Sequence, residues 1–568
     1  MQLTHRSNHF RSLRLAAPLA PVDLVKGVTS RNRQVISTFA LMLLATLALP
    51  LAPSPAAAQS CERIALLKLP GTTITAATRV AAGPFALPGT PPPGGSPQGS
   101  QGPPVLPPFC RVAITVLPTI KLEVWLPVSG WNGKFQAVGN GGRAGSISYA
   151  AMVTALKLGY ATASTDTGHE GSGEDSSWAI GHRERVVDFG YRAIHEMTVA
   201  AKKVIETFYG TAPRLSFFNG CSTGGRQGLM EAQRYPGDYD GIVAGDPVNF
   251  YTHFLAGEGL WVALATLKDP ESYIPPSKLP AIDDASVAAC DAIDGVKDGL
   301  ISDPLKCKFD PTILLCKAPD SPACLTAKQL EAVKKIYRGS HYADGKEIFP
   351  GTMPGHERGW TSFITGTGPS EATFALSVGF LKYFVFEDPN WNFRTWNYER
   401  DLALSDRKVG SIFNATDPNL GPFRAHGGKL ILYHGWTDPG VSPLNTINYY
   451  KSVVAMVSGA DSDAFEHETE AFLRSVSQTA DFVRLFMVPG MDHCGGGPGP
   501  NNFDAFGSLA DWVEHKRAPD KILASHMTNG AVDRTRPLCP YPMTAQYTGQ
   551  GSTDSAANFV CELPGSNK

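Results

Sequence analysis

The stretch FFNGCSTGGRQG, residues 217–228, decides the fold, because it joins the end of a strand to the start of a helix. The apolar residues 215–220 are typical of a buried strand, and residues 224–236 have the apolar spacing of a helix. The GCSTG turn between them matches G-x-S-x-G, a pattern in which the serine projects from a sharp strand-to-helix turn. Glycines on both sides permit that turn without Cβ clashes. We predict that Ser222 is a catalytic nucleophile and not part of an ordinary glycine-rich turn.

Strand-like and helix-like segments alternate on both sides of this turn. The alternation is typical of a parallel sheet covered by helices. It stops between residues 248 and 426, a region rich in tryptophan, phenylalanine, proline and cysteine. We therefore predict an α/β core in two parts, 59–247 and 427–568, with a lid domain at 248–426 inserted between them. The predicted strands are 121–127, 135–139, 159–165, 215–220, 239–245, 428–435 and 482–490, and the predicted helices are 186–210, 224–236, 443–458 and 505–516.

The composition is that of a globular protein. The 568 residues are 43% hydrophobic and 18% charged, with a formal net charge of −2. These values do not indicate the basic surface of a nucleic-acid-binding protein, so we predict no nucleic-acid partner. A stretch rich in proline, glycine and serine, residues 89–108, is predicted to be an exposed loop.

The N-terminus has the features of an export signal. The apolar run 35–52 follows two arginines, and the small residues behind it form an A-x-A cleavage site that ends at Ala58. A membrane anchor is the alternative, but Pro50 and Pro53 make the run shorter than a comfortable membrane span. We therefore predict a signal peptide at 1–58 and a secreted or periplasmic mature protein without a membrane anchor.

An acid and a histidine follow two of the later predicted strands. In an α/β-hydrolase the chain order is serine, acid, histidine. YHGWTDPG (433–440) places Asp438 just past one buried strand, and VPGMDHCGGG (488–497) places His493 in a glycine-rich loop past the next. The carboxyl ends of parallel strands meet at one edge of the sheet. We therefore predict a triad of Ser222, His493 and Asp438 on an α/β-hydrolase core with a large inserted lid.

Three neighbouring residues are weaker candidates for the same roles. Asp246 also follows a strand, but it lies in an earlier turn, and we rank it second to Asp438. Asp492 is adjacent to His493, and a residue so close in sequence rarely curls back to hold the ring. His434 lies at the end of its strand, and we expect it to have a structural role.

Cysteines lie beside two of the three predicted catalytic residues. The chain has ten cysteines, and an even count behind an export signal indicates five disulfides. Cys221 directly precedes Ser222, and Cys494 directly follows His493. A disulfide holds two Cα atoms about 4.4–6.8 Å apart, so a Cys221–Cys494 bridge would tie the nucleophile's turn to the histidine's loop. Two free buried thiols are the alternative, which an oxidising compartment disfavours.

Together these motifs resemble the tannase and feruloyl esterase family of secreted serine hydrolases. The shared features are the Cys-Ser pair in NGCSTGGRQG, the aspartate in YHGWTDPG and the His-Cys pair in MDHCGGG. The blocks STDTGH (164–169), FGYRAIH (189–195) and YDGIVAGDP (239–247) add to the resemblance, which extends over essentially the whole mature chain. It implies an α/β-hydrolase with a large lid that acts on aromatic acid esters.

The resemblance implies a substrate class and, together with the motif, an oxyanion hole. The expected substrate is a small aromatic ester of feruloyl, hydroxycinnamoyl or galloyl type, such as plants contain, cleaved through an acyl-enzyme. The alternatives are a phthalate- or terephthalate-type half-ester and a non-enzymatic, calcium-bound binding module, which would not need the complete triad. One oxyanion donor should be the N–H of Thr223, the residue after the nucleophile. The family pattern implies Gly141 or Gly142, in GNGGRAG (139–145), as the second.

An acidic loop, CDAIDGVKDGLIS (290–302), lies in the predicted lid. Hard oxygen donors on a flexible loop suit Ca²⁺, and a solvated acidic turn is the alternative. The resemblance supports a structural calcium ion, because family members carry a lid calcium site with this spacing. The expected ligands are the carboxylates of Asp291, Asp294 and Asp298 and the carbonyls of Val296 and Leu300.

The sequence leaves the other disulfides and the substrate pocket less determined. Proximity suggests four further bridges, with which the family arrangement agrees: Cys61–Cys110, Cys290–Cys307, Cys316–Cys324 and Cys539–Cys561. Aromatic lid residues could hold a phenyl group, but most of them could simply form the lid core: Phe380, Tyr383, Phe386, Trp391 and Trp396. Val441 could line the pocket or could equally be plain packing, and a carboxylate-bearing substrate would need an arginine such as Arg394 or Arg400.

Overall fold

The computed structural model describes residues 60–89, 102–317, 319–460 and 470–563. The predicted signal peptide and most of the proline-rich stretch lie outside the described residues. The end of that stretch is not a simple exposed loop, because β3 (Val105–Leu106) pairs with β2 (Gly83–Pro84) and Leu106 is buried. Within the described ranges no helix combines the length and the apolar character that a membrane span requires.

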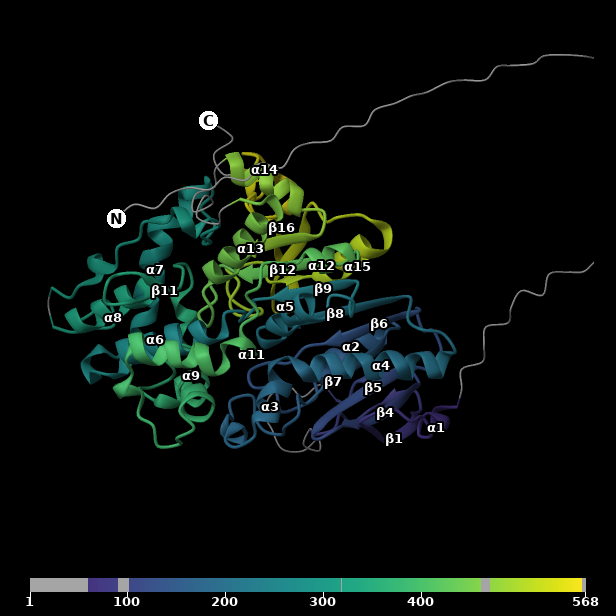
Figure 1. Ribbon diagram of the computed structural model, residues 1–568. Helices are drawn as coiled ribbons and strands as arrows, with labels where there is room; N and C mark the ends of the chain where they lie inside the picture. Colours follow the sequence, from purple (N-terminus) through teal and green to yellow (C-terminus); the bar gives the residue numbers. More distant parts are fainter. Residues whose placement is uncertain (1–59, 90–101, 318, 461–469, 564–568) are drawn as a thin grey trace, which may run out of the picture. The chain divides into compact units, whose positions relative to one another are not determined.

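A nine-stranded mixed sheet, in the order β1-β4-β5-β7-β6-β8-β9-β12-β13, forms the centre of the fold (Figure 1). The pairings β1–β4, β4–β5 and β5–β7 are antiparallel, and all pairings from β7 onward are parallel. The strands are β1 Thr72–Val80, β4 Phe109–Val116, β5 Ile120–Pro127, β6 Lys134–Val138, β7 Ala161–Thr165, β8 Leu215–Cys221, β9 Gly241–Gly245, β12 Lys429–Gly435 and β13 Val483–Val488.

Helices cover both faces of this sheet. Phe218 of β8 and Ile242 of β9 lie in one apolar cluster with α4 and α5, whereas their neighbours Phe217 and Val243 lie in another with α15. Successive side chains of a strand point to opposite faces, so a sheet covered on both faces needs continuous apolar strands. The helices of the core are α1 Cys61–Ile64, α2 Tyr149–Lys157, α3 Arg183–Val187, α4 Ala193–Tyr209, α5 Thr223–Arg234, α13 Pro443–Ser458, α14 Glu470–Thr479 and α15 Ala505–His515.

The predicted core elements are present, with ends that differ by a few residues. The helix predicted at 186–210 is interrupted, because a π-helical turn at Asp188–Arg192 separates α3 from α4. The strands β1 and β4 at one edge of the sheet were not predicted. Nor were the C-terminal strands, which are β14 Asn502–Phe503, β15 Ile522–Thr528, β16 Ala531–Leu538, β17 Thr544–Tyr547 and β18 Phe559–Glu562.

The chain between β9 and β12 forms a mainly helical insertion, in which α6, α7, α8 and α9 are grouped together (Figure 1). Its apolar cluster also includes Ala144, Phe189 and Val441 of the core, so the insertion packs directly on the core. The described residues form one compact unit, and the lid boundaries at 248–426 stay a prediction. The insertion contains α6 Leu260–Leu267, α7 Leu279–Cys290, α8 Ala327–Arg338, α9 Ala375–Phe380, α10 Ala403–Ser405, α11 Ser411–Phe413, α12 Gly421–Ala425, β10 Gly339–His341 and β11 Glu347–Pro350.

All ten cysteines are paired. The structure contains the five predicted disulfides Cys61–Cys110, Cys221–Cys494, Cys290–Cys307, Cys316–Cys324 and Cys539–Cys561.

Candidate active site

Ser222 lies at the turn between β8 and α5, at the carboxyl end of the parallel strands. Its backbone has φ 63° and ψ −122°, a strained conformation for a residue other than glycine and one that is common at functional sites. The flanking glycines are needed for close packing, because a Cβ on Gly220 would lie 2.6 Å from the backbone of Gly224. The Ser222 N–H donates to the carbonyl of Gly245 at 2.9 Å, which fixes the turn against β9.

The structure brings the three predicted catalytic side chains into one hydrogen-bonded chain. His493 Nε2 lies 2.8 Å from Ser222 Oγ, and His493 Nδ1 lies 2.6 Å from Asp438 Oδ2. The other carboxylate oxygen of Asp438 accepts the N–H groups of Gly440 at 2.7 Å and Val441 at 2.9 Å. Asp438 is only 1% exposed, so these bonds replace its contacts with water.

The charges of Asp438 and His493 stabilise one another. Burial alone would raise the pKa of Asp438, but the charge of His493 and hydrogen bonds from His434 and His493 hold that pKa well below its ordinary value. Burial opposes the protonation of His493, but the charge and hydrogen bond of Asp438 raise the pKa of His493 to about 9. The protonated form of His493 is therefore stabilised.

The weaker candidates occupy other positions. Asp492 Oδ1 lies 2.8 Å from Nδ1 of His356, a residue of the insertion. Asp246 is buried beneath the triad, with Oδ1 3.6 Å from Nε2 of His434. His434 Nε2 in turn lies 3.2 Å from Asp438 Oδ2, a direct contact with the triad that the sequence analysis did not anticipate.

The Cys221–Cys494 disulfide joins the residue before Ser222 to the residue after His493, with the two Cα atoms 6.0 Å apart. The chain beyond the bridge has little intrinsic rigidity, because Gly495, Gly496 and Gly497 all have positive φ. The bridge is therefore the covalent link that holds the histidine's loop next to the serine's turn.

Two groups of backbone donors face the cavity beside Ser222. Thr223 is the first residue of α5, so its N–H has no acceptor within the helix. In the loop 139–144, the N–H groups of Gly139, Asn140, Arg143 and Ala144 all donate to other acceptors, and those of Gly141 and Gly142 do not. Both glycines line the cavity, so either can supply the second oxyanion donor.

A cavity of about 520 Å³ opens onto Ser222, between the core and the insertion. Its apolar walls include Tyr251, Phe254 and Phe363, and the ring of Phe363 packs edge-on against His493 with centroids 5.4 Å apart. Val441 lines the cavity, as the sequence analysis proposed. For the five aromatic residues that were candidates for either the pocket or the lid core, the lid-core alternative holds, because they pack in the apolar cluster of the insertion. Those residues are Phe380, Tyr383, Phe386, Trp391 and Trp396.

The cavity has few charged groups. Arg143 lines it but is buried, and its three nitrogens donate to the Ser176 hydroxyl, the Tyr251 hydroxyl and the Leu376 carbonyl. Glu174 places an exposed carboxylate at the cavity. The two arginines considered for a carboxylate-bearing substrate do not line the cavity. Arg394 donates to the carbonyl of Leu267, and Arg400 pairs with Asp401.

In the acidic loop at 290–302, a carboxylate accepts hydrogen bonds from backbone N–H groups of the same loop. Asp291 Oδ1 accepts the N–H groups of Asp298 and Gly299, both at 3.1 Å, and Asp298 pairs with the buried Arg536 of β16. Burial, together with the charges of Asp298 and Asp291, raises the pKa of Asp294, so a hard cation would suit this donor set. However, the loop is not among the four places in the described chain where three such ligand atoms lie within 4.8 Å of one another.

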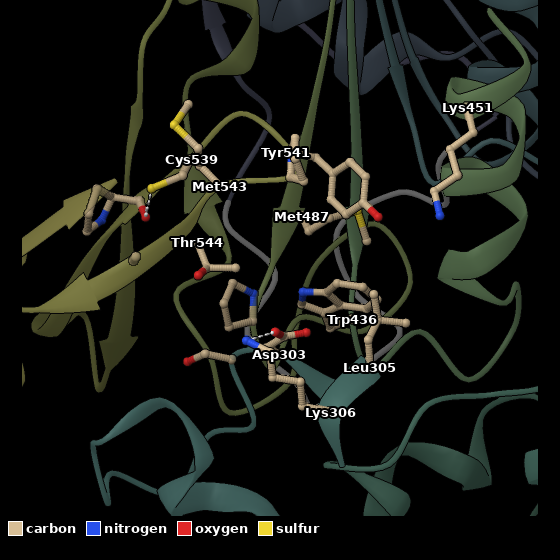
Figure 2. A pocket seen from close by; sticks show the side chains of 15 residues that line it. Asp303, Leu305, Lys306, Trp436, Lys451, Met487, Cys539, Tyr541, Met543 and Thr544 are labelled. Atoms are coloured by element: carbon tan, nitrogen blue, oxygen red, sulfur yellow. Dashed lines mark hydrogen bonds and ion pairs between the residues drawn. The ribbon is translucent and has the colours of Figure 1, made fainter. Parts of the chain in front are cut away.

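A second cavity, of about 350 Å³, lies beside the C-terminal segment and contains none of the triad residues (Figure 2). Trp436, Met487 and Tyr541 contribute to its wall, and Lys306 pairs with Asp303 at 2.9 Å. The cavity that opens onto Ser222 is therefore the candidate substrate site.

A family model described as "Tannase and feruloyl esterase" matches residues 107–562. The chain belongs to this family. An uncharacterised esterase of Xanthomonas campestris is 38% identical over 559 residues, which cover 92% of this chain and 94% of that protein. A probable feruloyl esterase B-1 of Aspergillus oryzae is 30% identical over 475 residues, which cover 80% of this chain and 84% of that protein. Since these relatives are esterases, the protein is a carboxylic ester hydrolase, and the binding-module alternative falls away.

Solved structures of the family confirm the α/β-hydrolase fold. Feruloyl esterase B from Aspergillus oryzae matches with a TM-score of 0.78 and 29% identity, over 88% of this chain and 99% of that chain. Tannin acyl hydrolase from Aspergillus niger matches with a TM-score of 0.70 over 90% of this chain and 94% of that chain, and at 22% identity it supports the fold alone.

Proposed function

We propose that this esterase hydrolyses small aromatic acid esters of feruloyl, hydroxycinnamoyl or galloyl type through an acyl-enzyme on Ser222. The observation that carries the proposal is the hydrogen-bonded chain Ser222–His493–Asp438, which opens onto an apolar cavity walled by aromatic side chains. The similarity to proteins named feruloyl esterase B supports the substrate class.

The proposed reaction uses the triad side chains and the backbone N–H groups beside Ser222. His493 Nε2 takes the Ser222 proton while Oγ bonds to the ester carbonyl carbon, and Asp438 stabilises the imidazolium. The N–H groups of Thr223 and of Gly141 or Gly142 hold the oxyanion. When the tetrahedral intermediate collapses, the ester bond breaks and His493 gives its proton to the leaving alcohol. Water, deprotonated by His493, then attacks the acyl-enzyme and releases the acid.

An uncharged acyl group suits this cavity better than a phthalate- or terephthalate-type half-ester. A buried carboxylate needs a cation or several donors to replace its water. Among the described residues that line the cavity, Arg143 is the one with a guanidinium or ammonium group, and all three of its nitrogens are engaged by the protein. The exposed carboxylate of Glu174 adds repulsion.

We further propose a structural Ca²⁺ on the acidic loop, held by Asp291, Asp294 and Asp298 and the carbonyls of Val296 and Leu300, and export of the mature chain. Calcium would relieve the repulsion between the carboxylates of this loop. Five disulfides support a protein that folds in an oxidising compartment.

A substrate panel tests the proposed function. Initial rates on methyl ferulate, methyl gallate, chlorogenate and a terephthalate half-ester should show turnover of the aromatic esters and the slowest turnover of the half-ester. A fluorophosphonate probe should label Ser222 in the wild type and leave Ser222→Ala unlabelled. Preference for the half-ester, or labelling at another residue, would contradict the proposal.

A further inference from the structure

Two buried side chains, His434 and Asp246, lie beneath the triad and are not members of it. Both are 0% exposed. His434 Nδ1 lies 2.7 Å from the hydroxyl of Thr446, and its Nε2 lies 3.0 Å from the carbonyl of Val441 and 3.2 Å from Asp438 Oδ2. An imidazole that carries its proton on Nε2 can donate to both acceptors and accept the Thr446 hydroxyl proton on Nδ1.

His434, together with His493, holds the Asp438 carboxylate in place. Asp438 Oδ2 lies between two imidazoles, His493 Nδ1 at 2.6 Å and His434 Nε2 at 3.2 Å. The Val441 N–H binds Asp438 Oδ1, and the Val441 carbonyl faces His434 Nε2. His434 therefore holds both the carboxylate and the turn that orients it, so a rotation of the carboxylate away from His493 would break several bonds.

Asp246 fixes the end of the strand that carries His434. Its Oδ1 accepts the Gly435 N–H at 2.9 Å, and its own N–H donates to the Tyr433 carbonyl at 2.9 Å. Asp246 keeps a strained backbone, with φ 37°, to make these contacts. The same Oδ1 lies 3.6 Å from His434 Nε2. The ionisable groups that act on His434 are Asp246, Asp438 and His493.

We propose that His434 and Asp246 are positioning residues that extend the chain Ser222–His493–Asp438 by a second histidine and a second aspartate. His434 holds the Asp438 carboxylate in the orientation that His493 needs, and Asp246 holds His434 and adds a negative charge beneath the site. This inference rests on the proposed function, because it assigns these residues to the same reaction.

The electrostatics agree with this arrangement. Burial raises the pKa of Asp246 to about 6, so its carboxylate is ionised above that pH. The charge of Asp246, together with that of Asp438, raises the pKa of His493.

Two substitutions of His434 separate a hydrogen-bond role from a space-filling role. His434→Phe fills the volume without a donor, whereas His434→Gln keeps an N–H near the position of Nε2. We expect His434→Phe to lower kcat by on the order of ten- to a hundredfold with KM within about twofold, because a misplaced catalytic group is costly. His434→Gln should recover most of this loss. Equal activity of the two variants and the wild type would overturn the assignment.

A control uses the partly buried histidine–aspartate contact of another region. His195 Nδ1 lies 2.7 Å from Asp238 Oδ2 on the α4 side of the sheet, away from the triad. His195→Phe and His195→Gln should leave kcat unchanged. If His434→Phe does not fold by circular dichroism, Thr446→Val, which removes the hydroxyl that orients the ring, should still lower kcat with KM unchanged; wild-type kcat in Thr446→Val would then overturn the assignment.

A pH profile tests Asp246. Its negative charge favours the imidazolium of His493, so Asp246→Asn should lower the pKa of His493 and move the rise of kcat/KM to lower pH, by about one unit. A residue with only a packing role would leave the midpoint unchanged, and an unchanged midpoint would overturn the assignment. Activity in Ser222→Ala would instead mean that the proposed function fails. If Ser222→Ala is inactive while the His434 and Asp246 variants match the wild type, only this inference fails.

Discussion

The catalytic edge of the sheet and the insertion that covers it are built in different ways. At the edge, three short turns after β8, β12 and β13 supply Ser222, Asp438 and His493. Hydrogen bonds hold all three, and a disulfide joins the turn of Ser222 to the loop of His493. In the insertion, Tyr251, Phe254 and Phe363 reach the cavity through the packing of many helices. The positions of the triad side chains therefore depend on local backbone geometry, whereas the shape of the pocket depends on long-range packing.

Removing the nucleophile is the most severe test of the catalytic edge. Ser222→Ala should lower kcat by several orders of magnitude, because a triad without its nucleophile keeps only the oxyanion hole and binding. Circular dichroism should show an unchanged fold, since the hydroxyl is small and lies at the cavity. Near-native turnover of an activated aromatic ester would contradict the assignment.

Removing the Cys221–Cys494 bridge tests whether this edge depends on its covalent link. The double substitution Cys221→Ala with Cys494→Ala should lower kcat by on the order of a hundredfold, because the glycine-rich loop then positions His493 poorly. KM should change much less. The control is the pair Cys316→Ala with Cys324→Ala, which removes a disulfide of the insertion and should leave kcat intact. Equal effects of the two pairs would show that the bridge acts only on stability.

The pH dependence reports the charge of His493. The carboxylate of Asp438 raises the pKa of His493 to about 9, and only the neutral imidazole can accept the Ser222 proton. Below that value, kcat/KM should therefore rise about tenfold per pH unit, with the plateau on its alkaline side. A profile of kcat/KM against pH measures this midpoint, and a midpoint near that of an ordinary histidine would contradict the electrostatic account.

The same contrast explains how much the sequence predicts. The presence of the parallel strands and the positions of Ser222, Asp438 and His493 follow from short motifs and apolar runs, because each depends on a few consecutive residues. The half-exposed edge strand β1, TTITAATRV, lacks the apolar run that revealed the central strands. The contact of His434 with Asp438 had one local signal, their spacing of four residues across the end of β12.

The residues that line the pocket are harder to predict from the sequence than the triad. Tyr251 and Phe254 follow shortly after β9, whereas the five aromatic residues named as candidates lie farther along the insertion and pack in its apolar cluster. An aromatic residue reaches a core or a cavity according to how distant segments pack, and a single sequence does not show that packing.

Calcium binding would stabilise the insertion more than the catalytic edge. If the acidic loop binds Ca²⁺, excess chelator should lower the melting temperature by several degrees, because ligand binding stabilises the native state by mass action. Asp294→Ala should melt at the lower temperature with or without chelator. Glu371→Ala, which removes a surface carboxylate of the insertion paired with Lys382, is the control and should respond as the wild type does. A calcium-free protein whose melting is unaffected by chelator would rule the site out.

Removing the charge of Glu174 at the rim of the cavity should have the smallest effect on activity, and this effect should be limited to anionic substrates. Glu174 is exposed at the cavity, in a segment where Glu170 pairs with Lys121, and Glu174 forms no ion pair with any residue that the structure describes. Two charges about 7 Å apart in water repel by roughly 0.6 kcal/mol, a factor of two to three in rate. Glu174→Gln should therefore raise kcat/KM for monomethyl terephthalate, an anion, by about this factor and leave dimethyl terephthalate unchanged. Added salt should erase the difference, because it screens exposed charges. Glu170→Gln, on the same segment, should have a smaller effect, since Lys121 already neutralises that carboxylate. If Glu174→Gln raised the rates of both esters equally, the effect would come from the shape of the rim and not from its charge.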